Sequence, residues 1–296
     1  MIELTTETRN INSMQLDSLT SLEIVELMNA EDAILAEAVG KEKHTIAKAI
    51  DAIVNSFQRG GRLFYIGAGT SGRLGVLDAS ECPPTFNTPP EMVVGIIAGG
   101  DSALRRPIEG AEDSLTAAAE DLTEHQFSSA DTLVGIASSG GTPYVLGGID
   151  HARQCGAVTV GVTCNANSKL HQHAEIIIAP LVGPEILSGS TRLKSGTATK
   201  MVLNMLTTGA MVKIGKTYGN LMVDLRASNT KLRERSKRIV SEVTGLDMVA
   251  AERLLSICDG DVKTAIVSHL CSVDGTTARL RLDRAGGRLR GALEHE

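Results

Sequence analysis

The sequence has no tryptophan, and aromatic residues make up only 2% of its 296 residues. Proteins that bind single-stranded nucleic acids stack the bases on exposed aromatic rings, and this chain has few rings to offer. Its net charge of −6 gives no basic surface for a phosphodiester backbone. We therefore expect no nucleic-acid partner, and a core built from aliphatic side chains.

Cysteines are also few, five in number, and none forms a Cys-x-x-Cys pair. Reduced thiols in a cytoplasmic protein are the simplest interpretation. No signal-peptide pattern is visible, and no apolar run approaches the roughly 20 residues of a membrane span. His171 and His173 form a His-x-His pair, but without a third ligand at metal-site spacing. We expect a cytoplasmic protein with no membrane contact and no metal.

Short apolar runs alternate with helical patterns between residues 62 and 180. Continuous apolar runs are typical of a parallel sheet that is covered on both faces. The sequence therefore predicts an α/β fold with a doubly wound, five-stranded parallel sheet. The predicted strands are 62–66, 92–97, 132–137, 157–162 and 175–179, and the predicted intervening helices are 72–80, 109–122 and 143–155.

The segments on either side of this pattern differ in character. Residues 1–20 are polar and predict an extended arm, followed by helices at 21–38 and 43–58. A helix at 193–215 is apolar nearly all round and is expected to be buried. Short helices with charged faces follow. We predict three parts: an arm with helices that pack on the core (1–60), a ligand-binding domain (61–240) and a small all-helical subdomain (241–296), which loosely resembles a ubiquitin-associated unit.

A glycine- and hydroxyl-rich loop follows the first strand and opens a helix. It contains Gly69, Thr70 and Ser71, whose backbone N–H groups, hydroxyls and helix dipole are the groups that bind a phosphate. Gly67, Gly69 and Gly72 also satisfy Gly-x-Gly-x-x-Gly, so a dinucleotide is an alternative ligand. Dinucleotide sites also expect an acidic residue about 20 positions further on, at the end of the second strand, whereas Asp101 follows that strand roughly 30 positions beyond the loop.

A second hydroxyl-rich loop follows the third predicted strand. Its candidate phosphate ligands are Ser138, Ser139, Gly140 and Thr142, ahead of a helix that begins near Pro143. Loops at the carboxyl ends of neighbouring parallel strands converge on one crevice. Two hydroxyl-rich loops, each at the start of a helix, suit a phosphomonoester better than a pyrophosphate. The alternative is that these hydroxyls only cap helices.

A third polar loop precedes the long buried helix. Ser190, Arg192 and Lys194 are its candidate ligands for a phosphate or a carboxylate. Cations at a helix N-terminus oppose the helix dipole, which indicates an anion nearby.

The two hydroxyl loops resemble those of the sugar isomerase (SIS) domain, a five-stranded parallel sheet that binds phosphosugars. Over essentially the whole chain, the segments at 67–86, 109–114, 189–205 and 218–232 resemble the N-acetylmuramic acid 6-phosphate etherases. The most specific are DASECPPT and GSTRLKSGTATK. The resemblance implies a SIS-type fold for residues 61–240 and a homodimer, because SIS proteins usually build their site at a dimer interface.

The resemblance also implies the chemistry. Such a lyase splits the D-lactyl ether of N-acetylmuramic acid 6-phosphate into N-acetylglucosamine 6-phosphate and D-lactate, in cell-wall sugar recycling, without a metal or redox cofactor. Glu81 and Glu112 match the family's two catalytic glutamates, Glu81 as the acid at the leaving oxygen and Glu112 as the base at C2. We expect both carboxylates to be partly buried, with Glu81 fixed where Pro83 and Pro84 end its helix.

Three alternatives stay open at this point. A non-catalytic phosphosugar sensor that regulates a sugar kinase would keep the loops but not need both glutamates. A phosphosugar isomerase and a nicotinamide-dependent oxidoreductase are less favoured. One departure from the family concerns Gly141, which stands where the etherases more often carry an arginine.

Overall fold

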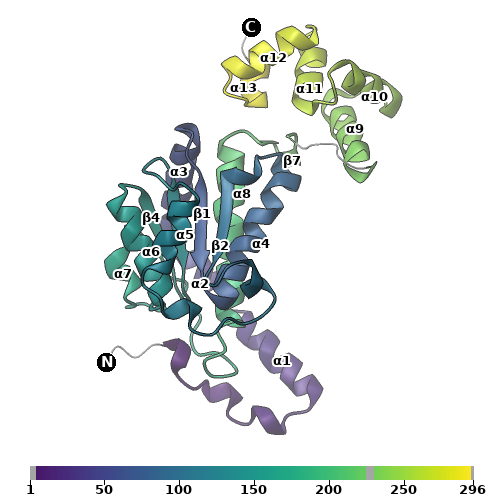
Figure 1. The fold of residues 1–296 in the computed structure, drawn as a ribbon. Coiled ribbons are helices and arrows are strands. Elements are labelled where there is room, and N and C mark those ends of the chain that lie inside the picture. Colours follow the sequence, from purple (N-terminus) through teal and green to yellow (C-terminus); the bar gives the residue numbers. More distant parts are fainter. Residues whose placement is uncertain (1–4, 225–229, 295–296) are drawn as a thin grey trace. The chain divides into compact units, whose positions relative to one another are not determined.

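Figure 1 shows the computed structural model, which describes residues 5–224 and 230–294. The chain forms two compact units. The first holds the residues up to Ser80 together with 90–207, and the second holds 81–89 and the residues from Thr208 onward. The predicted boundaries at residues 60 and 240 stay a prediction. Within the described residues, no helix combines the length and the apolar composition needed to cross a membrane.

The core of the first unit is a parallel sheet of five strands, as predicted. The strands are β1 (Leu63–Gly67), β2 (Val93–Ile97), β3 (Thr132–Ile136), β4 (Val158–Val162) and β5 (Ile176–Ile178). Their order is β2-β1-β3-β4-β5, so β1 pairs with both β2 and β3. The winding direction reverses between β1 and β3, and ligands of such sheets bind at the carboxyl ends on either side of this point. The two hydroxyl-rich loops follow these two strands.

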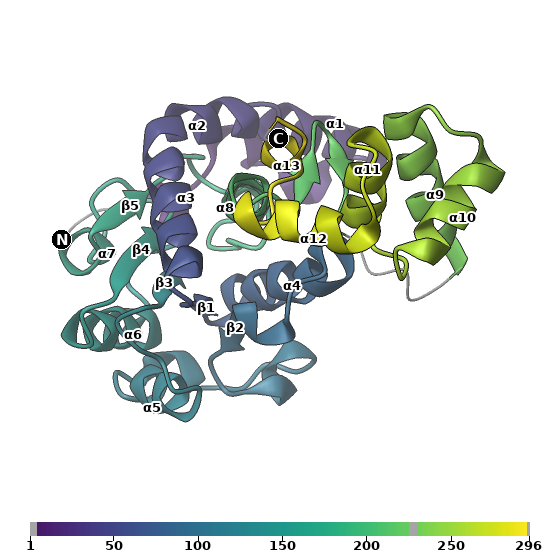
Figure 2. The same ribbon diagram turned by 90° about the horizontal axis from the view of Figure 1, so that it is seen from above.

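Helices cover both faces of the sheet (Figure 2). One face carries α3 (Lys43–Gln58), α4 (Gly69–Phe86) and α8 (Lys194–Lys213), and the other carries α5 (Ala117–Glu124), α6 (Pro143–Gln154) and α7 (Leu170–His173). Strand glycines allow this close packing. A Cβ at Gly95 would lie 2.6 Å from the Val76 Cα of α4, and one at Gly135 would lie 2.8 Å from Val145 Cγ1 of α6. Both layers are therefore held tightly against the strands.

The N-terminal segment differs from its prediction. Residues 5–18 are not extended but form three 3₁₀ turns, at Thr5–Glu7, Ile11–Ser13 and Leu16–Ser18. The helix predicted at 21–38 is two helices, α1 (Ser21–Asp32) and α2 (Leu35–Lys41). Thr20 and Glu23 form a reciprocal capping box that starts α1.

Two helix boundaries were also predicted wrongly. Helix α4 continues through Pro83 and Pro84 to Phe86 and ends where Asn87 takes a left-handed φ of 51°. The helix predicted at 109–122 begins only at Ala117, because Gly110 takes a φ of 73° and Glu112 lies on a separate 3₁₀ turn, Ala111–Asp113.

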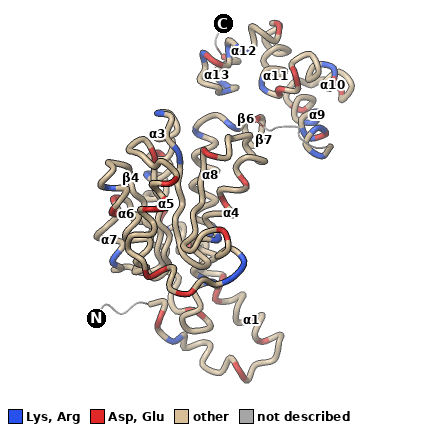
Figure 3. Tube along the Cα trace, viewed as in Figure 1, with Lys and Arg blue, Asp and Glu red and all other residues tan. Residues whose placement is uncertain are grey.

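The second unit is mostly helical, as predicted for the C-terminal part. A short antiparallel pair, β6 (Thr217–Tyr218) and β7 (Leu221–Met222), precedes α9 (Thr230–Thr244), α10 (Met248–Ile257), α11 (Val262–Leu270), α12 (Gly275–Arg284) and α13 (Leu289–Glu294). Asp247, Asp261 and Asp274 each cap the helix that follows. Acidic and basic residues are interspersed along the described chain (Figure 3).

Candidate functional site

The first loop brings the end of β1 directly onto the start of α4. A Cβ at Gly72 would lie only 2.5 Å from the Gly67 carbonyl oxygen, so this turn accepts no larger residue at position 72. Gly69 takes a left-handed φ of 52°. Thr70 and Ser71 lie in the first turn of α4, both half-buried. The N–H groups of a first helical turn have no intrahelical acceptors, so this turn can receive an anion.

The second loop, residues 138–142, is fixed by close contacts. Gly140 is buried with a φ of 66°, and a Cβ there would lie 2.1 Å from Ser168 Oγ. Ser139 Oγ accepts a 3.3 Å hydrogen bond from Gly141 N. Thr142 is the N-cap residue of α6, but its side chain makes no capping hydrogen bond. Helix capping therefore does not account for the Thr142 hydroxyl, which is available to a ligand.

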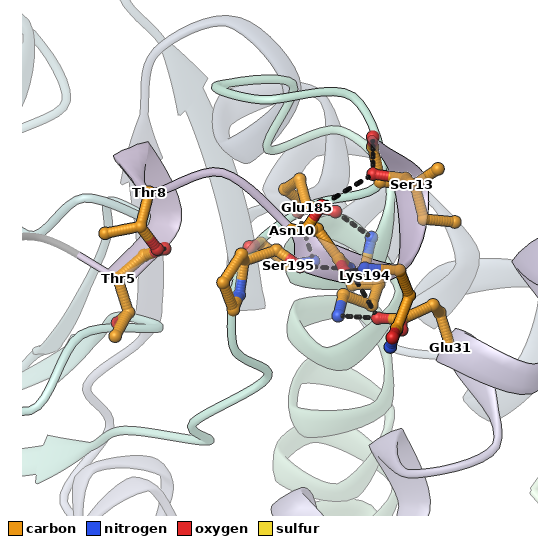
Figure 4. A network of polar contacts seen from close by, with 11 residues as sticks. Thr5, Thr8, Asn10, Ser13, Glu31, Glu185, Lys194 and Ser195 are labelled. Carbon is orange, nitrogen blue, oxygen red and sulfur yellow. Dashed lines mark hydrogen bonds and ion pairs between the residues drawn. The ribbon is translucent and has the colours of Figure 1, made fainter. Parts of the chain in front are cut away.

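The third loop gives Lys194 a role other than the predicted one (Figure 4). The buried carboxylate of Glu185 accepts hydrogen bonds of 2.9 Å from both Lys194 N and Ser195 N, the first amides of α8. The Lys194 ammonium, 1% exposed, pairs with Glu31 Oε2 of α1 at 2.6 Å. The anions that these groups meet thus belong to the chain itself. Ser190 is half-buried, and Arg192 is exposed.

The three loops lie together in the first unit. Cys164, after β4, donates from its N–H to the Ser138 carbonyl at 2.9 Å, and its Sγ lies 3.9 Å from the Ser195 carbonyl oxygen. A Cβ at Gly196, in the first turn of α8, would lie 3.6 Å from Thr70 Cγ2. Burial raises the pKa of Cys164 to about 12, so its thiol stays neutral. The predicted convergence of the hydroxyl loops is therefore present.

A pocket of about 370 Å³ lies beside the first loop. It joins Gly69, a candidate phosphate ligand, to Glu112, a candidate base. Arg73 also lines the pocket, and its guanidinium donates to the carbonyls of Ala103 and Leu104 at 2.6 and 3.0 Å, which fixes that wall. The lining residues are Ala68, Gly69, Arg73, Ala98, Ala103, Pro107, Ile108, Glu109, Gly110, Ala111 and Glu112.

The two candidate catalytic glutamates are placed differently. Glu112 lines the pocket on its 3₁₀ turn, in the first unit. Glu81 lies on α4 and belongs to the second unit. Both are exposed, against the prediction of partial burial.

Sequence analysis missed the residues that tie the loops together: Glu31, Glu185, Cys164 and Asn165. Glu185 and Asn165 are almost completely buried polar side chains. The partners of Glu31 and Asn165 are remote in sequence, since Lys194 lies 163 positions from Glu31 and Thr6 lies 159 from Asn165. No local pattern identifies such pairs.

Comparisons with known proteins agree on the fold. The sequence model of the glucokinase regulatory protein N-terminal SIS domain matches residues 45–153, and the model of the SIS domain matches residues 116–209. A phosphoheptose isomerase from Francisella tularensis superposes with a TM-score of 0.51 at 17% identity, over 64% of this chain and 100% of that chain. This likeness shows a shared fold.

Three curated relatives are similar over nearly their whole length. The N-acetylmuramic acid 6-phosphate etherase of Rhodopirellula baltica is 60% identical over 97% of this chain and 95% of its own. Those of Clostridium beijerinckii and Salmonella typhi are 56% and 53% identical, over 98% and 99% of this chain and 96% and 98% of their own. With identity this high over this length, the chain belongs to the N-acetylmuramic acid 6-phosphate etherase family.

Proposed function

We propose that this chain cleaves the D-lactyl ether of N-acetylmuramic acid 6-phosphate to give N-acetylglucosamine 6-phosphate and D-lactate, in cell-wall sugar recycling. The observation that carries the proposal is the near-full-length identity of 60% with a named etherase. The site supports it, because the first of the two hydroxyl-rich loops at the switch point of the sheet lies beside a pocket lined by Glu112. The kinase-regulator alternative is not favoured, since the relatives named above are etherases.

The proposed reaction is a lyase reaction, elimination followed by hydration. An alkoxide is a poor leaving group, so direct displacement by water is slow. The open-chain sugar has an aldehyde that acidifies the neighbouring C2 proton. A base removes this proton, the C3–O bond breaks with its electron pair going to the lactyl oxygen, and an acid protonates that oxygen. Water then adds its oxygen to C3 of the unsaturated aldehyde and a proton to C2.

In this scheme Glu112 is the base at C2 and Glu81 the acid at the lactyl oxygen. The assignment rests on the match of DASECPPT and of the segment at 109–114 to the family. The pocket supports the place of Glu112, which lies in the same lining as Gly69.

The phosphate would bind to Gly69, Thr70 and Ser71 of the first loop and to the second loop, Ser138, Ser139, Gly140 and Thr142. Amides and hydroxyls at two helix starts suit an anion with three terminal oxygens. Arg192 and Ser190 are the proposed ligands of the lactyl carboxylate, because Arg192 is exposed and lies just before α8. Lys194 is excluded from this set by its pairing with Glu31.

We further propose a cytoplasmic homodimer with the site near the interface. The exposure of Glu112 supports this, because a second copy that covers the open side of the pocket would exclude water from the reacting carbons.

The test is D-lactate release from N-acetylmuramic acid 6-phosphate by the purified protein, with unphosphorylated N-acetylmuramic acid as the control. Release that depends on the 6-phosphate supports the function and the phosphate-binding loops. Clear binding of the phosphosugar without any lactate would replace the proposal with the sensor.

A further inference from the structure

The N-terminal arm, residues 5–13, is joined by hydrogen bonds to two residues that hold site loops. Thr6 bonds to Asn165, and Asn10 bonds to Glu31, the partner of Lys194 (Figure 4 shows the second connection). The arm's polar side chains Thr6 and Asn10 are only 0% and 7% exposed. A surface arm that merely covers a core buries apolar side chains, whereas this one buries hydrogen-bonding groups that all find partners. Those partners lead to the second loop in one direction and to the first turn of α8 in the other.

The first connection runs through Asn165, which follows β4 and is 2% exposed. Asn165 Nδ2 donates to the Ser138 carbonyl at 2.9 Å and to Thr6 Oγ1 at 3.1 Å. Its Oδ1 accepts from Thr5 Oγ1 at 2.9 Å and from Thr6 N at 3.4 Å. A backbone carbonyl can only accept and a backbone N–H can only donate, so this is the one orientation of the amide that fits.

All four hydrogen-bonding positions of the Asn165 side-chain amide are therefore used. Three of these bonds go to Thr5 and Thr6 of the arm. The one remaining bond holds the carbonyl of Ser138, the first residue of the second loop. Because a buried amide that loses a partner keeps the cost of its desolvation, the Thr6 hydroxyl stabilises this arrangement of the loop.

The second connection runs through Glu31 of α1. Asn10 Nδ2 donates to Glu31 Oε2 at 2.8 Å, and Asn12 Nδ2 donates to Glu31 Oε1 at 2.8 Å. The same Oε2 pairs with the Lys194 ammonium at 2.6 Å, at the start of α8. Asn10 also contacts the Pro184 carbonyl at 3.3 Å, next to Glu185, whose carboxylate caps α8.

We propose that the N-terminal arm is a positioning element of the phosphosugar site. Thr6, through Asn165, holds the second loop, and Asn10, through Glu31, holds the first turn of α8. The arm touches no reacting atom. It holds the second loop, a proposed phosphate ligand, and the start of α8, next to the proposed ligands of the lactyl carboxylate, in place before the substrate arrives. Binding therefore does not have to include the free-energy cost of ordering them. The functional part of the inference rests on the proposed function.

The decisive variant is Thr6→Val, which keeps the shape of the side chain and removes the acceptor of Asn165 Nδ2. We expect the KM for N-acetylmuramic acid 6-phosphate to rise about five- to tenfold, with kcat within about twofold of the original. Thr6→Ser, which restores a hydroxyl, should return KM to its original value. A variant that only destabilised the fold would instead lower the apparent kcat and leave KM unchanged.

The matched control is Thr8→Val, in the same arm. Among the described residues, the Thr8 hydroxyl donates to the Thr5 carbonyl three positions before it, at 2.8 Å, and not to Asn165, so KM should not change. Asn10→Ala, with the exposed Asn29→Ala of α1 as its control, tests the second connection in the same way. The inference is overturned if Thr6→Val leaves KM within about twofold, or if Thr8→Val raises KM as much.

Amide hydrogen exchange of the protein without ligand separates this inference from the proposed function. Thr6→Val should speed exchange in the segment around residues 138–142 and in residues 163–165, and Thr8→Val should not. Unchanged exchange in Thr6→Val overturns the positioning role whatever the substrate is. If Thr6→Val speeds exchange but the original protein releases no lactate, the arm keeps its positioning role and the etherase activity is refuted.

Discussion

Lys194 and Glu31 form an ion pair of 2.6 Å that joins the first turn of α8 to the last turn of α1. The lysine stands in the segment GSTRLKSGTATK, where a cation ahead of a helix predicts a bound anion. The anion is a carboxylate of the chain, so this lysine contributes to the fold around the site rather than to the substrate's binding.

Lys194→Met should lower the free energy of unfolding by about 2–4 kcal/mol, because it leaves a nearly buried carboxylate without its cation. The control is Lys41→Met, which breaks the exposed pair of Lys41 with Glu37 and should cost less than about 0.5 kcal/mol. Denaturant titration of both variants measures the difference. Equal losses of unfolding free energy in the two variants would show that the buried pair stabilises the fold no more than the exposed one.

The same pair predicts a pH dependence. Burial alone would raise the pKa of Glu31, but hydrogen bonds from Lys194 and two asparagines outweigh it and hold the pKa below the ordinary 4.5. A carboxyl whose folded pKa is lowered contributes stability above its unfolded pKa and loses it as the pH falls through the folded value. The unfolding free energies of the original protein and Glu31→Gln should therefore converge on acidification. Parallel curves down to the acid limit would contradict this.

Glu112→Gln should lower kcat at least about 100-fold and leave the affinity for N-acetylglucosamine 6-phosphate unchanged, since the amide cannot accept the C2 proton. Asp113→Asn, the neighbouring exposed acid on the same 3₁₀ turn, is the matched control and should keep full activity. Near-normal turnover by Glu112→Gln would remove it from the mechanism. Glu81→Gln should likewise lower kcat and leave the affinity for N-acetylglucosamine 6-phosphate unchanged, and near-normal turnover would remove Glu81 from the mechanism.

Gly141→Arg should lower KM up to about tenfold, because it adds a charge-assisted hydrogen-bond donor beside the proposed phosphate loop. The site has room for a side chain: a Cβ at Gly141 would have Ser139 Oγ, at 3.9 Å, as its nearest neighbour. Gly141→Ala adds the Cβ without the charge and should leave KM unchanged. A KM that rises in Gly141→Arg would show that the loop needs its glycine.

The sheet could be predicted because its strands are short apolar runs with clear polar limits, and burial on both faces requires that composition. The order of the strands was not predicted, but pairing of β1 with β3 puts both hydroxyl loops at the switch point, as their sequences indicate. The local sequence was enough to predict the strands and the meeting of the two loops.

Local chemistry failed where a boundary or a partner depended on the rest of the chain. The helix that carries Glu120 starts after Ser114, whose Oγ accepts from Ala117 N at 3.1 Å. The extended backbone of Ser114 (φ −77°, ψ 122°) separates this helix from the 3₁₀ turn that carries Glu112. Prolines 83 and 84 predicted a helix end, yet the turn continues because Asn87 N reaches the Pro83 carbonyl at 3.0 Å. The partner of Lys194 lies 163 residues away, beyond any periodic pattern.

The measurement that tests the proposed mechanism most directly is the reaction of N-acetylmuramic acid 6-phosphate in D₂O, with D-lactate measured and the sugar product examined by NMR. Elimination and hydration predict D-lactate together with N-acetylglucosamine 6-phosphate that carries deuterium at C2, because the base removes the original proton and solvent supplies the new one. Lactate release with the C2 proton fully retained would contradict elimination, and an absence of lactate would contradict the etherase function itself.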